Sequence, residues 1–158
     1  MKANFAASLA LTVAFAGTSL AAPCETGQLD IKSDGNISRF AIEIADSPEE
    51  RAQGLMDRSY MAQFSGMLFA YTTPRQVSFW MKNTLIPLDM LIIDPSGVVL
   101  RIHENAVPHD LTPIPGGDQI QYVLEINGGL ARALNITEGA QVRHPEINND
   151  LAIWPCSE

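Results

Sequence analysis

The chain has 158 residues, with 10 Lys and Arg against 18 Asp and Glu, and its formal net charge is −8 at pH 7. Its length predicts a single domain beyond any targeting segment. An acidic surface repels phosphate backbones and anionic headgroups, which argues against nucleic acid and membrane surfaces as partners.

The first residues have the pattern of a secretory signal peptide. Lys2 supplies a positive charge, residues 5–17 are mostly apolar, and residues 19–21 (Ser-Leu-Ala) form a small-x-small cleavage signal. A transmembrane anchor is the alternative, but the apolar run is shorter than the roughly 20 residues that a bilayer requires. We therefore expect a signal peptide at 1–21 and a mature domain at 22–158 that is periplasmic or secreted. No segment of the mature chain is expected to span a membrane.

Two cysteines, Cys24 and Cys156, lie at the two ends of the mature domain. An even cysteine count in an exported protein predicts a disulfide between them. Two alternatives remain open at this stage. Cys24 could be a lipidated N-terminal cysteine, although Pro23 before it suits that processing poorly, or both cysteines could be buried free thiols.

The rest of the chain consists of short apolar or alternating runs separated by turns. One example is the run at 38–44, where Phe40, Ile42 and Ile44 alternate with polar residues, as expected of a half-buried strand. Such a pattern predicts a mainly β fold, a compact sandwich or barrel. We predict strands at 28–32, 38–44, 67–71, 77–82, 88–94, 98–104, 120–126, 140–144 and 151–155.

One short capped helix is predicted among these strands. Ser47 is a suitable N-cap, Pro48 a suitable first helical residue, and Glu50 completes a capping box. The helix should end near Gly54 or Met56. We expect Arg51 and Arg58 to be solvated or paired with nearby acids such as Glu49, Glu50 or Asp57.

Residues 103–119 differ from the strand-rich segments because they contain three prolines and two adjacent glycines. They predict a long surface loop, and loops of this length are often functional or mobile.

The sequence Phe-Trp-Met-Lys-Asn-Thr at 79–84 is the candidate functional site. If it is extended, Phe79 and Met81 face the core, and Trp80 and Lys82 face the opposite side. We expect Trp80, Lys82 and Asn83 to border a ligand site, with Asp89 supporting Lys82. Trp80 could instead cap the edge of the core, and Lys82 could form a structural salt bridge with Asp89 or Glu125.

Asp89 and Glu125 are acids inside apolar stretches, so a buried position would require hydrogen bonds or ion pairs. Two such carboxyl groups brought together could perform general acid–base chemistry, as in glycosidases. Nothing in their spacing shows that they meet.

The methionines, together with His103 and His109, allow a copper site to be considered, because thioethers and imidazoles suit copper. They form no compact motif, and we predict neither a metal site nor a cofactor. His144 is expected to be structural or solvated.

Several separate pieces of the chain resemble one known family. They are Gly54-Leu55-Met56, Gly66-Met67-Leu68-Phe69, the 79–84 segment, Pro87-Leu88-Asp89, Gly97-Val98-Val99 and residues 125–129. Over about 38–142 the chain resembles the domain of unknown function 192 family. It departs from the family pattern at Ile126-Asn127-Gly128 and near Met61-Ala62. The resemblance implies a compact, jelly-roll-like β fold, and it implies no established activity or catalytic residues.

Two classes of function follow from these observations. The first is an exported binding or accessory module, whose partner is a small polar ligand or an envelope protein at the Trp80–Lys82 surface. The second is a hydrolase of envelope carbohydrate that uses Asp89 and Glu125. Whether the protein is an enzyme stays open at the level of sequence.

Overall fold

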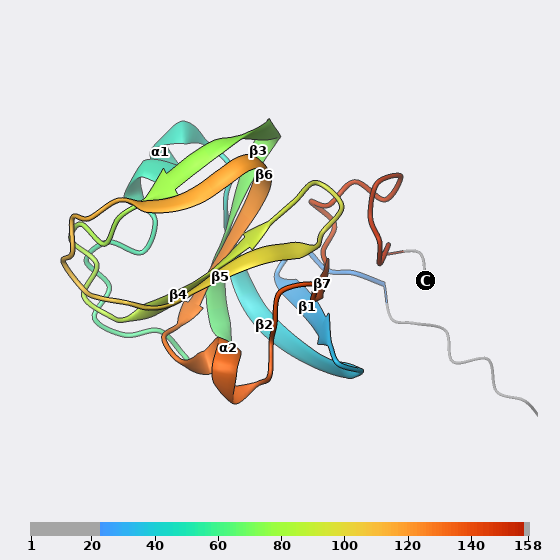
Figure 1. Cartoon of the computed structure of the whole chain (residues 1–158), viewed down its shortest axis with the longest axis horizontal. Coiled ribbons are helices and arrows are strands. Elements are labelled where there is room, and N and C mark those ends of the chain that lie inside the picture. Colours follow the sequence, from blue (N-terminus) through green and yellow to red (C-terminus); the bar gives the residue numbers. More distant parts are fainter. Residues whose placement is uncertain (1–22, 157–158) are drawn as a thin grey trace, which may run out of the picture.

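The computed structural model describes residues 23–156, and the predicted signal peptide at 1–21 lies outside them. The fold is mainly β, as predicted, with two short helices (Figure 1). The strands are β1 (Gln28–Ser33), β2 (Asn36–Ala45), β3 (Ser65–Phe79), β4 (Leu88–Ile93), β5 (Val99–Ala106), β6 (Ile114–Asn127) and β7 (Gln141–Arg143), and the helices are α1 (Pro48–Gln53) and α2 (Leu130–Ala133).

All seven strands belong to one sheet in the order β5-β4-β6-β3-β2-β1-β7. Neighbouring strands are antiparallel except β2 and β3, which are parallel and are connected through α1. The sheet curls until its two ends meet near β5 and β7 (Figure 1). There the Val99 amide donates to the Ala140 carbonyl at 2.9 Å, and the Val142 amide donates to the Gly97 carbonyl at 2.7 Å. The result is a barrel-like fold.

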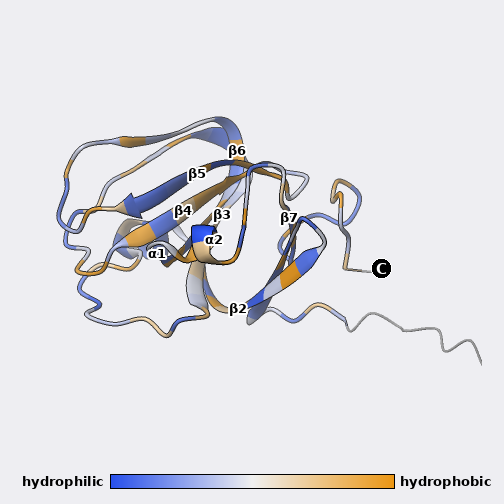
Figure 2. Ribbon diagram, turned by 60° about the horizontal axis from the view of Figure 1, so that its bottom comes forward, coloured by the Kyte–Doolittle hydropathy of each residue, from blue (hydrophilic) through white to orange (hydrophobic). Residues whose placement is uncertain are grey.

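Both faces of the central strands are buried. The inner face of the curled sheet holds one apolar cluster that includes Leu68, Leu91 and Leu124. The outer face holds a second cluster that includes Met67, Met90 and Val123. Figure 2 shows the contrast between the largely hydrophobic β4, which is buried along its whole length, and the more hydrophilic β5. A strand that is covered on both faces shows a nearly continuous apolar run instead of alternation.

β3 is longer than the sequence predicted. The predicted strands at 67–71 and 77–82 and the predicted loop at 72–75 are replaced by one strand that ends at Phe79. Its pairing with β6 is interrupted between Ala70 and Arg75, so the intervening residues form an exposed irregularity. Pro74 fits there because it has no amide to contribute to the ladder.

The predicted loop at 103–119 is much shorter in the structure. β5 continues to Ala106 and β6 begins at Ile114, because the end of β3 pairs with Pro115 and Ile114. Only residues 107–113 remain outside the strands. The last strand predicted at 151–155 is also wrong, since this segment forms turns.

The capped helix is confirmed. The Ser47 hydroxyl accepts from the Glu50 amide at 3.2 Å, and the Glu50 carboxylate accepts from the Ser47 amide at 3.1 Å. Pro48 is the first helical residue, and Gly54 ends the helix with a φ of 49°, which favours glycine.

The predicted disulfide between Cys24 and Cys156 is present, with the two Cα atoms 5.4 Å apart. It joins the start of the described chain to its end. Among residues 23–156 there is no helix long and apolar enough to cross a membrane.

Candidate functional site

A cavity of about 210 Å³ lies on the outer face of the sheet, between α1 and the end of β3. It is formed by residues from four separate parts of the chain: the last residues of α1 and those just after it, β3, the segment that follows β3, and β6. Its lining includes Arg51, Met56, Tyr71, Phe79, Trp80 and Glu125.

Glu125 is the buried polar residue of this cavity. It lies on β6 between Met67 of β3 and Met90 of β4, and residues paired in this way share one face of the sheet. The residue is only 5% exposed, and its carboxyl group makes no hydrogen bond or ion pair with any other described residue. Burial raises the pKa of Glu125 to about 8. The carboxyl group is therefore mostly protonated at neutral pH while the cavity holds no cation.

Trp80 is the exposed aromatic residue of the lining and forms the rim of the same cavity. It is 50% exposed, whereas Met81 is fully buried, so the predicted difference between these two neighbours is present. Phe79 is only half-buried, and its ring packs edge-on against Phe69 with centroids 5.4 Å apart. The exposed Lys82 places its ammonium 5.2 Å from the centre of the Trp80 ring. Trp80 and Lys82 thus lie together at the surface.

Trp80, Met81 and Lys82 follow β3 and are not part of it, although they show the burial that alternation predicted. The Met81 amide donates to the Asp110 carbonyl at 2.9 Å, which holds this segment against residues 107–113. Asn83 has a φ of 53° in a turn closed by the Thr84 amide and the Met81 carbonyl. Asn tolerates this left-handed conformation, so the backbone of Asn83 shapes the turn.

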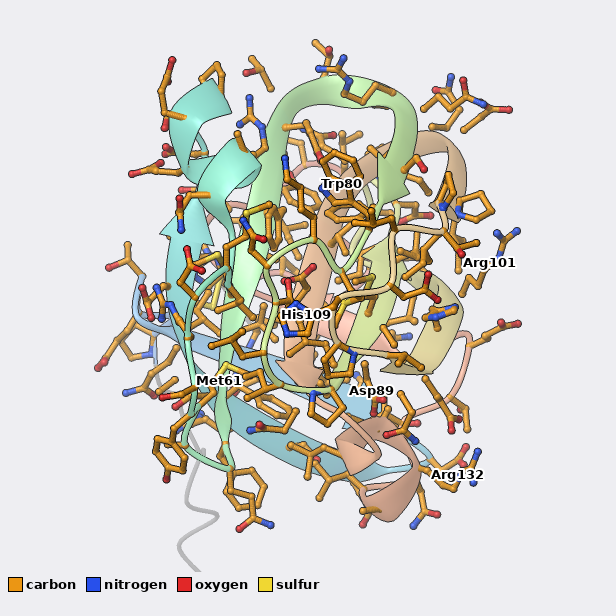
Figure 3. The ribbon with its side chains drawn as sticks, turned by 90° about the vertical axis from the view of Figure 1, so that its left-hand side faces the viewer. Met61, Trp80, Asp89, Arg101, His109 and Arg132 are labelled. Carbon is orange, nitrogen blue, oxygen red and sulfur yellow. A yellow bond between two sulfur atoms is a disulfide. The ribbon has the colours of Figure 1, made fainter. Side chains whose placement is uncertain are left out.

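Asp89 has a role that differs from the prediction. It is fully buried, and its carboxylate accepts from the backbone amides of Asn105 and Gly129 at 2.8 Å and of Ala131 at 2.9 Å. These amides belong to β5 and to the start of α2, which has no side-chain cap of its own. The described residues contain no ion pair between Asp89 and Lys82. Figure 3 shows Asp89 close to α2 and away from Trp80.

The two acids do not face one cleft. Asp89 pairs with Ile126 and Glu125 pairs with Met90, and consecutive residues of a strand project to opposite faces of the sheet. Glu125 therefore projects toward the outer core and Asp89 toward the inner one. The structure contradicts the hypothesis that these carboxyl groups flank a single glycosidic bond.

Arg51 and Arg58 have partners other than the predicted acids Glu49, Glu50 and Asp57. Arg51 donates to the carbonyls of Asp46 and Ala70, the latter at 2.9 Å, and its guanidinium lies 4.9 Å from the centre of the Tyr71 ring. Arg58 forms a bidentate ion pair with Glu43. The contact of Arg51 with Ala70 and that of Arg58 with Glu43 could not be predicted from the local sequence, since Ala70 lies on β3 and Glu43 on β2.

Larger hollows exist on the surface. One of about 530 Å³ lies near Tyr122, and one of about 340 Å³ lies near His103. The Tyr122 hydroxyl already donates to the Glu146 carbonyl at 2.8 Å, and His103 is partly exposed. Neither hollow contains a buried ionisable group without a partner among the described residues. The Glu125 cavity is distinguished by that feature, and sequence reasoning considered Glu125 only as a partner of Asp89 or Lys82.

The described residues contain no group of three or more His, Cys, Asp or Glu side chains placed to hold a metal ion. Met67, Met81 and Met90 lie in the outer apolar cluster, where they pack as core residues.

Comparison with known proteins places this fold in one family. The model of the DUF192 family, described as an uncharacterized ACR, matches residues 29–144. A solved structure from Sinorhizobium meliloti 1021, provisionally described as a transcription regulator, is 38% identical with a TM-score of 0.73 over 77% of this chain and 95% of that chain. A protein of unknown function from Novosphingobium aromaticivorans DSM 12444 is 34% identical with a TM-score of 0.72 over 82% of this chain and 99% of that chain. The search of curated proteins gave no match.

The family match extends beyond the 38–142 region of the sequence resemblance. It includes β1, and it continues through β7 at the closing edge of the sheet. The match therefore covers the whole curled sheet and the walls of the Glu125 cavity, and the chain belongs to the domain of unknown function 192 family.

Proposed function

We propose that this protein is an exported module that binds a small polar ligand in the cavity rimmed by Trp80. The observation that carries the proposal is the buried Glu125 carboxyl group, which borders a cavity and has no partner among the described residues. An unpaired buried polar group costs stability, so its presence in a fold requires a reason such as a ligand.

The position of the family-like segments supports the same site. Gly54-Leu55-Met56, Phe69, the 79–84 segment and Glu125 are far apart in the sequence, yet each contributes to the lining of this cavity. Lys82 is exposed and lies beside the Trp80 ring, and the exposed Asn83 follows it in the chain, so a polar part of a ligand that extends past Trp80 could reach them. A cavity of about 210 Å³ suits a compact ligand, since it is smaller than a typical drug-sized site.

Export is part of the proposal. It is supported by the signal-like pattern at 1–21 and by the Cys24–Cys156 disulfide, because disulfides persist mainly in oxidising compartments. The mass of the protein recovered from the exported fraction checks this, and we expect a chain that begins at Ala22. A mature chain that retains Met1 would contradict export through a cleaved signal.

A thermal-shift screen of compact polar compounds tests the binding function, because a ligand stabilises the folded state by mass action. We expect hits that raise the Tm of the wild type and of Tyr60→Ala but leave Trp80→Ala unchanged. Tyr60 is the matched control, since it is an aromatic residue that is 76% exposed and lies outside the cavity lining. Hits that stabilise all three proteins equally would place the binding site elsewhere.

Two other functions are less well supported. The hydrolase hypothesis required Asp89 and Glu125 to meet, and they project to opposite faces. Regulation of transcription, suggested for the Sinorhizobium relative, would require contact with nucleic acid, which a net charge of −8 disfavours.

A further inference from the structure

We propose that the ligand of the Trp80 cavity carries a protonated amine, and that its ammonium group is bound by the Glu125 carboxylate. This inference rests on the proposed binding function and assigns the chemical class of the ligand. It follows from three features of the cavity: a buried carboxyl group that has no partner among the described residues, the aromatic character of the walls, and the contacts of Arg51.

The first feature is Glu125 itself. Its carboxyl group is buried on the outer face of the central sheet, beside the apolar Met67 and Met90, and no described residue donates a hydrogen bond to it. A carboxylate in such a place is stabilised most by a cation that brings its own hydrogen-bond donors. An alkylammonium supplies both in a small volume.

The second feature is the aromatic lining. Phe69, Tyr71, Phe79 and Trp80 all border the cavity, and the rings of Phe69 and Phe79 pack edge-on against each other. The faces of aromatic rings attract cations, and the attraction is stronger where water is excluded. The apolar walls also accept the hydrocarbon part of an amine. An anionic ligand would instead meet the negative faces of these rings and the Glu125 carboxyl group.

The third feature is Arg51, the one cationic side chain that lines this cavity. Its guanidinium donates to the carbonyls of Asp46 and Ala70 and lies over the Tyr71 ring. The guanidinium of Arg75 lies 5.5 Å from the centre of the same ring. No ion pair joins Arg51 to Glu125 among the described residues. The charge of Glu125 is therefore left for a ligand. The last residues of α1 also border the cavity, and the carbonyl end of a helix favours positive charge.

The size of the cavity limits the amine. A volume of about 210 Å³ equals that of roughly seven water molecules in the liquid, so a ligand with one ring or a short chain fits. Benzylammonium is a suitable probe because two compounds of the same shape, benzyl alcohol and benzoate, replace the cation with a neutral group and an anion.

Binding of an ammonium has a defined pH dependence. Because the pKa of Glu125 is about 8 in the free protein, an ammonium must displace a proton from it at pH 7. The affinity for the amine should rise between pH 6 and pH 8, level off just above pH 8, and fall at more alkaline pH where the ammonium itself loses its proton. Arg51 from α1 and Tyr71 from β3 also border the cavity, and burial raises the pKa of Tyr71 above its ordinary value of about 10, so the phenol keeps its proton in this range.

The experiment is an NMR titration of the folded, oxidised protein with each of the three probes, in which the Trp80 indole N–H reports on the cavity. Calorimetry in two buffers of different ionisation enthalpy then counts the protons released. We expect benzylammonium to bind more tightly than benzyl alcohol or benzoate, with close to one proton released at pH 7. Glu125→Gln should weaken this binding by about tenfold to a hundredfold, as expected for the loss of a charge-assisted hydrogen bond.

Two variants control the result. Asp118→Asn removes one carboxylate from an exposed position of the same strand β6, and it should bind benzylammonium like the wild type. Glu125→Asp keeps the carboxylate and should retain the preference for the amine over the alcohol. The fold of each variant is checked by its NMR spectrum, and Gln at position 125 is expected to be tolerated because it removes a buried ionisable group.

Three outcomes overturn the amine assignment: benzyl alcohol binds at Trp80 as tightly as benzylammonium, Glu125→Gln binds the amine as the wild type does, or benzylammonium does not bind. The first two leave the cavity as a binding site and contradict only the ligand class. In the third, the broader thermal-shift screen with Trp80→Ala decides whether the binding function itself fails.

Discussion

At the scale of single residues, Glu125 is the most informative position. Between pH 4.5 and about 8, the folded protein keeps a proton on Glu125 that the unfolded chain releases. Stability is therefore lost as the pH rises through this window, and the full penalty is present above pH 8. The same buried group that destabilises the free protein is the group that a cationic ligand would satisfy.

This linkage gives a direct prediction for Glu125→Gln. The variant should match the wild type in stability near pH 4.5 and exceed it above pH 8 by a few kcal/mol, on the order expected for a pKa raised this far. Urea denaturation at pH 5 and pH 9 measures the difference. Burial lowers the pKa of His144, so this residue makes the protein more stable as the pH rises. Because His144 is present in both proteins, its contribution cancels in the difference between the variant and the wild type. An equal stability difference at both pH values would contradict the buried, ionisable state of Glu125.

A second prediction at this scale compares Phe79 with Trp80. Trp80→Ala should cost less than about 1 kcal/mol, since the side chain is half-exposed and its contact with Lys82 is a surface cation–π interaction. Phe79→Ala should cost about 2–3 kcal/mol, at or below the lower end of the range for a fully buried phenylalanine, because the ring is only half-buried against Phe69. Denaturation midpoints measure both. If Trp80→Ala destabilises the protein as much as Phe79→Ala does, Trp80 is a core residue.

At the scale of elements, the first turns of the two short helices are capped by side chains in different ways. α1 carries its own cap, whereas the cap of α2 comes from Asp89 on β4. The first device is local and the second joins residues 42 positions apart.

For α1, Ser47→Ala removes the side chain that accepts from the Glu50 amide. The expected loss is about 1 kcal/mol in the free energy of unfolding, the usual value for an N-cap. Chemical denaturation measures it, and Ser47→Thr is the control because a threonine hydroxyl can accept the same bond. If the alanine variant keeps the wild-type midpoint, the cap contributes nothing to stability.

For α2, Asp89→Ala leaves three buried or part-buried backbone amides without their acceptor. Each lost partner costs about 1–3 kcal/mol. Since single substitutions rarely cost more than about 5 kcal/mol, a total of roughly 3–5 kcal/mol is expected. Asp118→Ala on β6 is the matched control, since that side chain is exposed and should change stability by less than about 0.5 kcal/mol. A small effect at Asp89 would mean that water replaces its carboxylate at these amides.

At the scale of the whole molecule, the two ends of the described chain are joined twice. β1 pairs with β7 in the sheet, and Cys24 is bonded to Cys156 over a sequence separation of 132 residues. The imidazole of His144 also contacts the Thr26 carbonyl at 2.9 Å. Since the sheet already holds β1 on both sides, the disulfide acts mainly on the unfolded chain.

The double variant Cys24→Ser/Cys156→Ser should therefore keep the fold and lose stability. Chain-entropy arguments set a ceiling of roughly 5 kcal/mol for so long a loop, and about 2–4 kcal/mol is expected in practice. Thermal unfolding with and without a reductant provides the measurement, and the reductant should have no effect on the double variant. An unchanged Tm after complete reduction of the wild type would contradict a stabilising disulfide.

Much of the fold was accessible from the sequence because it depends on near neighbours in the chain. The Ser47 cap involves residues three positions apart, and the alternation at 38–44 depends only on the period of an extended chain. The same reasoning predicted that Met81 would be buried and Trp80 exposed. The family was identified by a different route, the resemblance of several separate motifs, and the disulfide was predicted from the even number of cysteines in an exported chain.

The candidate site could not be predicted fully from the sequence, because its features depend on strand register and on contacts across the sheet. Only the pairing of β6 with β3 and β4 decides that Glu125 projects toward the outer cavity while Asp89, on the neighbouring strand, projects toward the amides of α2. A shift of one residue in that register would exchange the two faces. The length of β3 was missed for the same reason, since residues 72–75 have a loop-like composition, and the strand continues past them because β6 pairs with β3 on both sides of this irregularity. The sequence by itself thus determined the class of fold and its local caps and turns. The tertiary structure alone decided that Glu125 borders the outer cavity and that Asp89 accepts hydrogen bonds from backbone amides.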